Sequence, residues 1–242
     1  MSLLCPKSDR DAVKALVCLI LCELLFCGIF WVDFLFDHPF WWVYELFNID
    51  QESNIPTWFS TIQLFLIGLL FLFIGYRTEH TPPPSKLGTK IFGFGFIYLS
   101  LDEAAIIHEK LTWVFINNPL VPYFHGRHGV WIVVYGTIAI ILLALLAKDL
   151  WALGKAYPRL SRIFLLGIVV FLFGSAGMET ITFFYLDESD KLVYTVEVIM
   201  EEFLEMAGVS VMLYSVLLLS LKKSEDPSPL IPEAIKRRVP FK

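Results

Sequence analysis

Acidic residues and one histidine lie inside three apolar segments of the chain, where membrane helices normally exclude charge. The first segment, Leu101–Lys110, reads LDEAAIIHEK; the second carries Glu179; the third, Glu197–Met206, reads EVIMEEFLEM. An ionised side chain at the centre of a bilayer costs roughly 2.5–3.5 kcal/mol on insertion scales. So many carboxyl groups must lie near the interface, face a wet cavity, carry protons or bind cations.

Helical periodicity predicts that most of these groups share faces. At 100° per residue, Asp102, His108 and Glu109 fall within about a third of the circumference of a continuous helix, whereas Glu103 points elsewhere. In the third segment Glu202 lies to one side of a stripe at four-residue spacing, formed by Glu197, Glu201 and Glu205.

This combination of side chains predicts a cation site. Carboxylates with an imidazole suit Fe, Mn or Zn, whereas carboxylates alone suit Ca, Mg or Mn. The Glu-x-x-His motif of carboxylate-bridged di-metal bundles is absent from the sequence. We predict one or two divalent metal ions (Fe, Mn or Zn), with the candidate ligands Asp102, His108, Glu109, Glu179, Glu197, Glu201 and Glu205. Two alternatives stay open: the acids share protons, or they line a solvated vestibule that serves only folding or assembly.

Six apolar segments would position these residues. A membrane-spanning helix needs about 20 mostly apolar residues, and 57% of this chain is hydrophobic, against roughly 45–50% in soluble domains. We predict an all-α, polytopic membrane bundle with spans at about 12–31, 58–76, 91–115, 130–150, 162–186 and 192–221. These spans form a transmembrane domain of residues 1–223, followed by a polar, basic cytoplasmic tail at 224–242.

The distribution of basic residues predicts the orientation. All of the 19 Lys and Arg residues except Lys110, Arg127 and Lys191 fall on one side of the six predicted spans. The positive-inside rule makes that side cytoplasmic, so both termini are cytoplasmic. The three acidic groups then share the outer half of the membrane.

Other features bear on the same site. The predicted external segment Pro39–Phe47 is rich in aromatic residues and typical of an interfacial helix. An external loop carries His125 and His128, which could complete a metal site if the loop folds back. Glu23 lies near the middle of the first span. The lipid bilayer is the expected partner; the chain has no basic run suited to nucleic acid and no glycine-rich phosphate loop.

The segments LDEAAIIHEKL and VEVIMEEFLEMAG resemble those of a group of bacterial multi-pass membrane proteins of unknown function. That group carries an LDE…HE segment, a Gly…Glu segment and an EE-x-L-E-M segment, which match Leu101–Glu109, Gly174–Glu179 and Glu201–Met206. The resemblance covers roughly the last 150 residues. It implies a bacterial inner-membrane protein and brings no substrate or reaction.

Three functions fit these observations. The first is a metal-dependent membrane enzyme acting on an apolar or lipid-like substrate, for which no catalytic residue is assigned. The second is a proton- or cation-coupled transporter, although the sequence has no internal repeat and no polar path to the cytoplasm. The third is a non-catalytic subunit that packs its many aromatic residues against partner subunits of a larger membrane complex.

Overall fold

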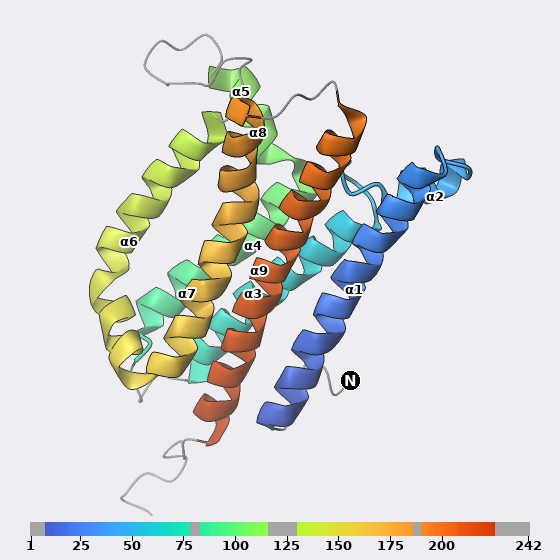
Figure 1. The fold of residues 1–242 in the computed structure, drawn as a ribbon. Coiled ribbons are helices and arrows are strands. Elements are labelled where there is room, and N and C mark those ends of the chain that lie inside the picture. Colours follow the sequence, from blue (N-terminus) through green and yellow to red (C-terminus); the bar gives the residue numbers. More distant parts are fainter. Residues whose placement is uncertain (1–7, 78–82, 116–129, 186–189, 226–242) are drawn as a thin grey trace, which may run out of the picture.

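The computed structural model describes residues 8–77, 83–115, 130–185 and 190–225, and within these ranges every regular element is a helix (Figure 1). His125 and His128 and nearly all of the predicted tail lie outside the described residues. In chain order the elements are α1 (Asp9–Leu35), α2 (Trp41–Phe47), α3 (Ile55–Arg77), α4 (Lys86–Ala105), α5 (Ile107–Phe115), α6 (Val130–Ala156), α7 (Pro158–Leu172), the π-helical turn η1 (Phe173–Met178), α8 (Glu179–Tyr185) and α9 (Lys191–Glu225).

Five stretches of helix in the described part of the chain are long and apolar enough to cross a membrane. They are Asp9–Leu35, Ile55–Tyr76, Trp131–Ala156, Pro158–Thr182 and Lys191–Lys223. This confirms the predicted all-α class, and five of the six predicted spans coincide with candidate membrane-spanning helices. The predicted third span, 91–115, corresponds to two helices, α4 and α5, which are separated at Ile106.

Helices α3 and α4 pack closely and antiparallel. A Cβ atom on Gly68 of α3 would lie 2.7 Å from the carbonyl oxygen of Gly93 of α4, so the two backbones nearly touch there. Further along the pair, the Ser100 hydroxyl donates to the carbonyl oxygen of Thr61 at 2.9 Å. Small residues allow this approach, as is common between helices in membranes.

Helix α9 packs against α7 in the same way. A Cβ atom on Gly208 would lie 2.5 Å from the backbone nitrogen of Phe171, and one on Gly167 would lie 2.8 Å from the carbonyl oxygen of Gly208. Helix α9 also contacts α1 and α3. It is therefore the helix around which much of the bundle assembles.

The larger of two apolar core clusters among the described residues fills one half of the bundle. It includes Ile67, Phe71 and Ile74 of α3 and Val216 of α9, all 3% exposed or less. The Phe71 ring packs against its aromatic neighbours on α4 and α7, Phe92, Phe96 and Phe164. This half lies towards the end where α1 begins and α9 ends (Figure 1). The intramembrane acids of the three segments lie towards the other end.

The contact at Gly208 gives a test of the α7–α9 interface. Gly208→Ala should lower the melting temperature in detergent, because its Cβ meets the backbone of Phe171 rather than a movable side chain. Overpacking of this kind costs about 1–3 kcal/mol. The matched control is Gly136→Ala on α6, where nothing lies within 4 Å of the added atom. Thermal unfolding followed by circular dichroism measures both, and equal melting temperatures would contradict the packing.

Candidate functional site

A break between α4 and α5 shapes the site. Ile106 has φ 56° and ψ 44°, the left-handed conformation, and its N–H donates to the carbonyl oxygen of Asp102. A β-branched residue rarely adopts this conformation. The predicted faces assumed one continuous helix, but the helix is interrupted at Ile106. Helix α5 therefore does not continue the line of α4.

The break brings His108 back against Asp102. Nδ1 of His108 lies 3.0 Å from Oδ2 of Asp102, and because a carboxylate only accepts hydrogen bonds, Nδ1 carries the hydrogen. The Tyr135 hydroxyl of α6 donates to the other carboxylate oxygen, Oδ1, at 2.7 Å, and the Trp131 ring packs edge-on against the imidazole. Asp102 thus orients the ring and leaves Nε2 available as a ligand or base.

Glutamates from three parts of the chain interact electrostatically with this histidine. Glu205 of α9 interacts electrostatically with His108, with Glu103 of α4 and with Glu52, which precedes α3. Glu202 interacts with Glu205, Glu103 and Glu52 in turn. Glu103 and Glu202 were placed off the shared faces in the prediction, yet both interact electrostatically with this group.

The remaining acids form the outer part of the cluster. The Thr182 hydroxyl of α8 donates to Glu197 at 2.5 Å, and Glu197 and Glu201 lie within hydrogen-bonding reach of each other. Nε1 of Trp131 donates to Glu179 at 2.9 Å. Glu179 also interacts electrostatically with Glu201 and Glu205. Glu109, the last predicted ligand, is exposed but interacts with Glu52 and His108.

The π-helical turn η1 brings Glu179 towards α9. A Cβ atom on Gly174 of η1 would lie 2.8 Å from the backbone nitrogen of Glu205 and 3.0 Å from the carbonyl oxygen of Glu201. The missing side chain therefore lets the turn lie directly on the acidic stretch of α9. Single π turns inside α-helices often occur at functional sites.

Glu52 was not among the predicted site residues, because it lies between two predicted spans rather than within one. The pKa of the Glu52 carboxyl group is raised by burial and further by Glu109 and Asp102, while the Thr57 hydroxyl and His108 oppose the shift. One feature of the sequence could have indicated it: Glu52 lies shortly before a predicted membrane span, at about the membrane depth of the outermost of the other acids.

The cluster contains many more acidic than basic residues. The nearby Lys110 turns away, because its Nζ donates to the backbone oxygen of Ala105 at 2.7 Å. Within the described residues, no three His, Cys, Asp or Glu side chains are already arranged to hold a metal ion. The cluster thus gathers all seven predicted residues, with Glu52, Glu103 and Glu202 added, but not in a finished coordination shell.

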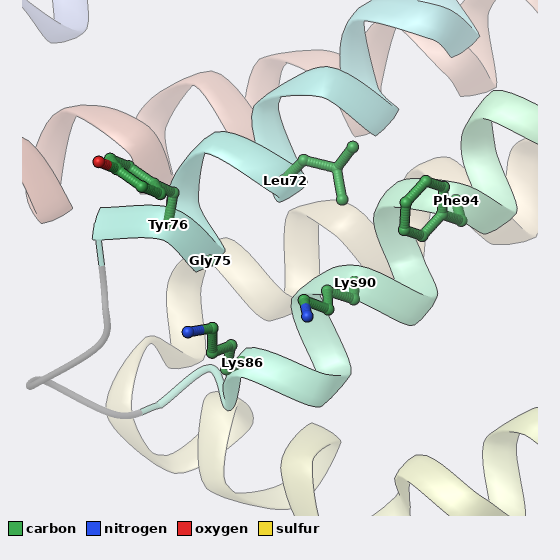
Figure 2. A pocket seen from close by; sticks show the side chains of 6 residues that line it. All are labelled: Leu72, Gly75, Tyr76, Lys86, Lys90 and Phe94. Carbon is green, nitrogen blue, oxygen red and sulfur yellow. The ribbon is translucent and has the colours of Figure 1, made fainter.

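A separate apolar groove of about 220 Å³ lies at the opposite end of α3 and α4. Figure 2 shows its lining residues, Leu72, Gly75, Tyr76, Lys86, Lys90 and Phe94. Lys86 and Lys90 belong to the first turns of α4, whereas Asp102 and Glu103 belong to its last turn. The groove is therefore not part of the acidic cluster.

A family model described as "Domain of unknown function (DUF8692)" matches residues 15–221. The match covers most of the chain and contains every residue of the acidic cluster, so the chain belongs to this family. No curated protein and no solved structure matches the chain.

The break at Ile106 can be tested by comparing two substitutions at that position. In a continuous helix alanine is more stable than glycine by about 1 kcal/mol. In the left-handed conformation the order reverses, because glycine has no Cβ to clash. Ile106→Gly should therefore have a higher melting temperature than Ile106→Ala, while at Leu101, an exposed position within α4, alanine should exceed glycine. The same order at both positions would mean that the helix is unbroken.

Proposed function

We propose that this DUF8692 member is a six-span protein of the bacterial inner membrane whose acidic cluster opens to the external side and binds a divalent metal ion. The metal, Fe, Mn or Zn, would serve a reaction on an apolar or lipid-like substrate. The observation that carries the proposal is the Asp102-oriented imidazole of His108, which lies among Glu52, Glu103 and Glu205.

The antiparallel packing of α4 on α3 supports six spans. If α3 crosses the membrane, α4 returns beside it, and its 20 residues extend about 30 Å, which matches the hydrocarbon thickness. An even number of spans also keeps the basic residues on one side, with both termini cytoplasmic. The acidic cluster then opens to the external face.

The chemistry of the donors supports a metal. A pair in which a carboxylate holds one ring nitrogen of a histidine is the usual support of a histidine ligand. His108, Glu103 and Glu205 are the proposed inner ligands, with Glu52 and Glu202 next to them. Because the glutamate side chains have rotatable bonds, binding would draw their carboxyl groups together around Nε2. Asp102 acts as a positioning residue, and Glu109, Glu179, Glu197 and Glu201 form the outer approach.

The surroundings of the outer end support an apolar or lipid-like substrate. Helix α2 exposes Trp41 and Trp42, as expected of a segment that lies in the membrane interface. The loop after α2 is joined to α9, because the Tyr194 hydroxyl donates to Asp50 at 2.7 Å. Glu52 belongs to this same loop, so an amphiphile held beside α2 would be near the cluster.

The apolar core favours a binding site over a transport route. Below the cluster, and beyond Gln63 and Ser210, the space between α3 and α9 is filled by buried apolar side chains such as Ile67, Phe71 and Val216. A continuous polar path to the cytoplasmic end would require these side chains to separate. We therefore rank a proton- or cation-coupled transporter, and a non-catalytic subunit of a larger complex, below the metal-dependent enzyme.

Elemental analysis of the purified full-length protein tests the proposal. After chelation and re-addition of Mn, Fe or Zn, the wild-type protein should retain a stoichiometric amount of one metal. His108→Ala and Glu205→Gln should lose it, and Asp102→Asn should weaken binding by about 10–100-fold, the usual effect of losing a second-shell partner.

The matched control is Glu45→Gln, because Glu45 lies on α2 and is exposed. It removes one carboxylate from the same end of the protein without touching the cluster and should leave the metal content unchanged. Wild-type protein without bound metal, or His108→Ala with full metal content, would refute the proposal.

A further inference from the structure

A second polar group lies deeper in the bundle than the acidic cluster. Glu23 of α1, Gln63 of α3 and Ser210 of α9 meet there, and they are 0%, 2% and 0% exposed. The Ser210 hydroxyl donates to Oε1 of Glu23 at 2.5 Å. Nε2 of Gln63 donates to Ser210 at 2.9 Å and lies 3.5 Å from the same Glu23 oxygen. Three helices thus supply one connected network.

Two oxygen atoms in this network lack a hydrogen-bond donor among the described residues. They are Oε2 of Glu23 and Oε1 of Gln63, and both are buried. Buried polar atoms in proteins are almost always hydrogen-bonded. The Ser210 hydrogen is directed at Oε1 of Glu23, and the Gln63 amide group donates to Ser210 and faces the same Glu23 oxygen. The network therefore needs one more hydrogen.

Within the part of the chain that the structure describes, no cation interacts with Glu23 to balance an ionised carboxylate. The described titratable groups that interact with it are two thiols of its own helix, Cys22 and Cys27. The neighbouring helices α3 and α9 contribute Gln63 and Ser210, which are neutral. Glu23 also lies near the middle of α1, about 20 Å along the helix from either end. An unpaired carboxylate is most costly at this depth.

We propose that Glu23, Gln63 and Ser210 form a proton-binding site in the middle of the membrane. The proton resides on Oε2 of Glu23, the carboxyl oxygen that has no donor, while Ser210 and Gln63 hold the other oxygen. This site is distinct from the metal site proposed above, and neither depends on the other.

The neighbours of Glu23 indicate the side from which the proton exchanges. Cys27 lies one turn further along α1 and interacts electrostatically with both Glu23 and Glu202. Glu202 in turn belongs to the acidic cluster. Buried apolar side chains lie on both sides of Glu23, with Met206 towards the acidic cluster and Ile67 and Leu213 in the other direction. Exchange is assigned to the side of the acidic cluster because Cys27 links Glu23 electrostatically to Glu202 there.

Infrared difference spectroscopy of the full-length protein in lipid tests the proposal. The spectrum of the wild type minus Glu23→Gln at neutral pH should contain the C=O stretch of a protonated carboxylic acid, which shifts down in D₂O. Ser210→Ala should move this band to higher frequency, because the carbonyl oxygen loses its donor. If Glu23 only positioned its neighbours and carried no proton, neither the acid band nor its shift in Ser210→Ala would be seen. The exposed Glu45→Gln should instead remove only a carboxylate band.

Two results would overturn the proposal. A pair of carboxylate bands lost in Glu23→Gln would mean that Glu23 is ionised. An acid band that is present in choline chloride but disappears in sodium chloride would mean that the site holds Na⁺ in place of the proton.

A stability measurement keeps the proposal testable if the spectra are weak. Glutamine has the shape of a protonated glutamate, so Glu23→Gln should melt at the same temperature as the wild type near neutral pH, and above it at alkaline pH. A lower melting temperature for Glu23→Gln at neutral pH would show that the fold requires the anion.

Discussion

The hydrocarbon interior of a membrane does not solvate ionised carboxyl groups, and the architecture of this protein follows from that constraint. Each acid within the bundle must find a donor, a proton or a cation inside the protein. Asp102 accepts from Tyr135 and His108, Glu197 from Thr182 and Glu179 from Trp131. Among the described residues, Glu103, Glu202 and Glu205 have no such side-chain donor. These three acids are therefore the ones that most need a proton or a cation.

Irregular backbone makes this concentration possible. An unbroken helix would spread Asp102 and His108 apart, but the left-handed residue between them folds the chain back. The π-helical turn and Gly174 bring Glu179 onto the acidic stretch of α9 in a comparable way. Strained or unusual backbone persists where the surrounding packing holds it, and such places are often functional. Here both irregularities occur at the same end of the bundle as the acids.

The helices and much of the site could be predicted from the sequence, because long apolar segments and i, i+4 spacing are local signals. The outer stripe of α9 follows from spacing alone. Glu103 and Glu202 were left out of the site because the faces were counted on ideal helices, whereas their electrostatic interactions with the cluster come from residues of other segments. Ile106 gives no sign of its left-handed conformation, since its residue type argues against it. The place of Glu52 in the cluster depends on long-range electrostatic interactions between a loop and the helices α4 and α9. Helical periodicity does not report interactions of this kind.

The central claim is that a divalent cation binds at Nε2 of His108 together with glutamates of α4 and α9. The most direct measurement is an anomalous difference map from crystals of the full-length protein grown with Mn or Zn. Zinc at this site should give a peak about 2.0–2.1 Å from His108 Nε2, with carboxylate oxygens of Glu103 and Glu205 completing the contacts. A metal bound elsewhere, or an ordered His108 whose Nε2 contacts only protein or water in the presence of saturating metal, would contradict it.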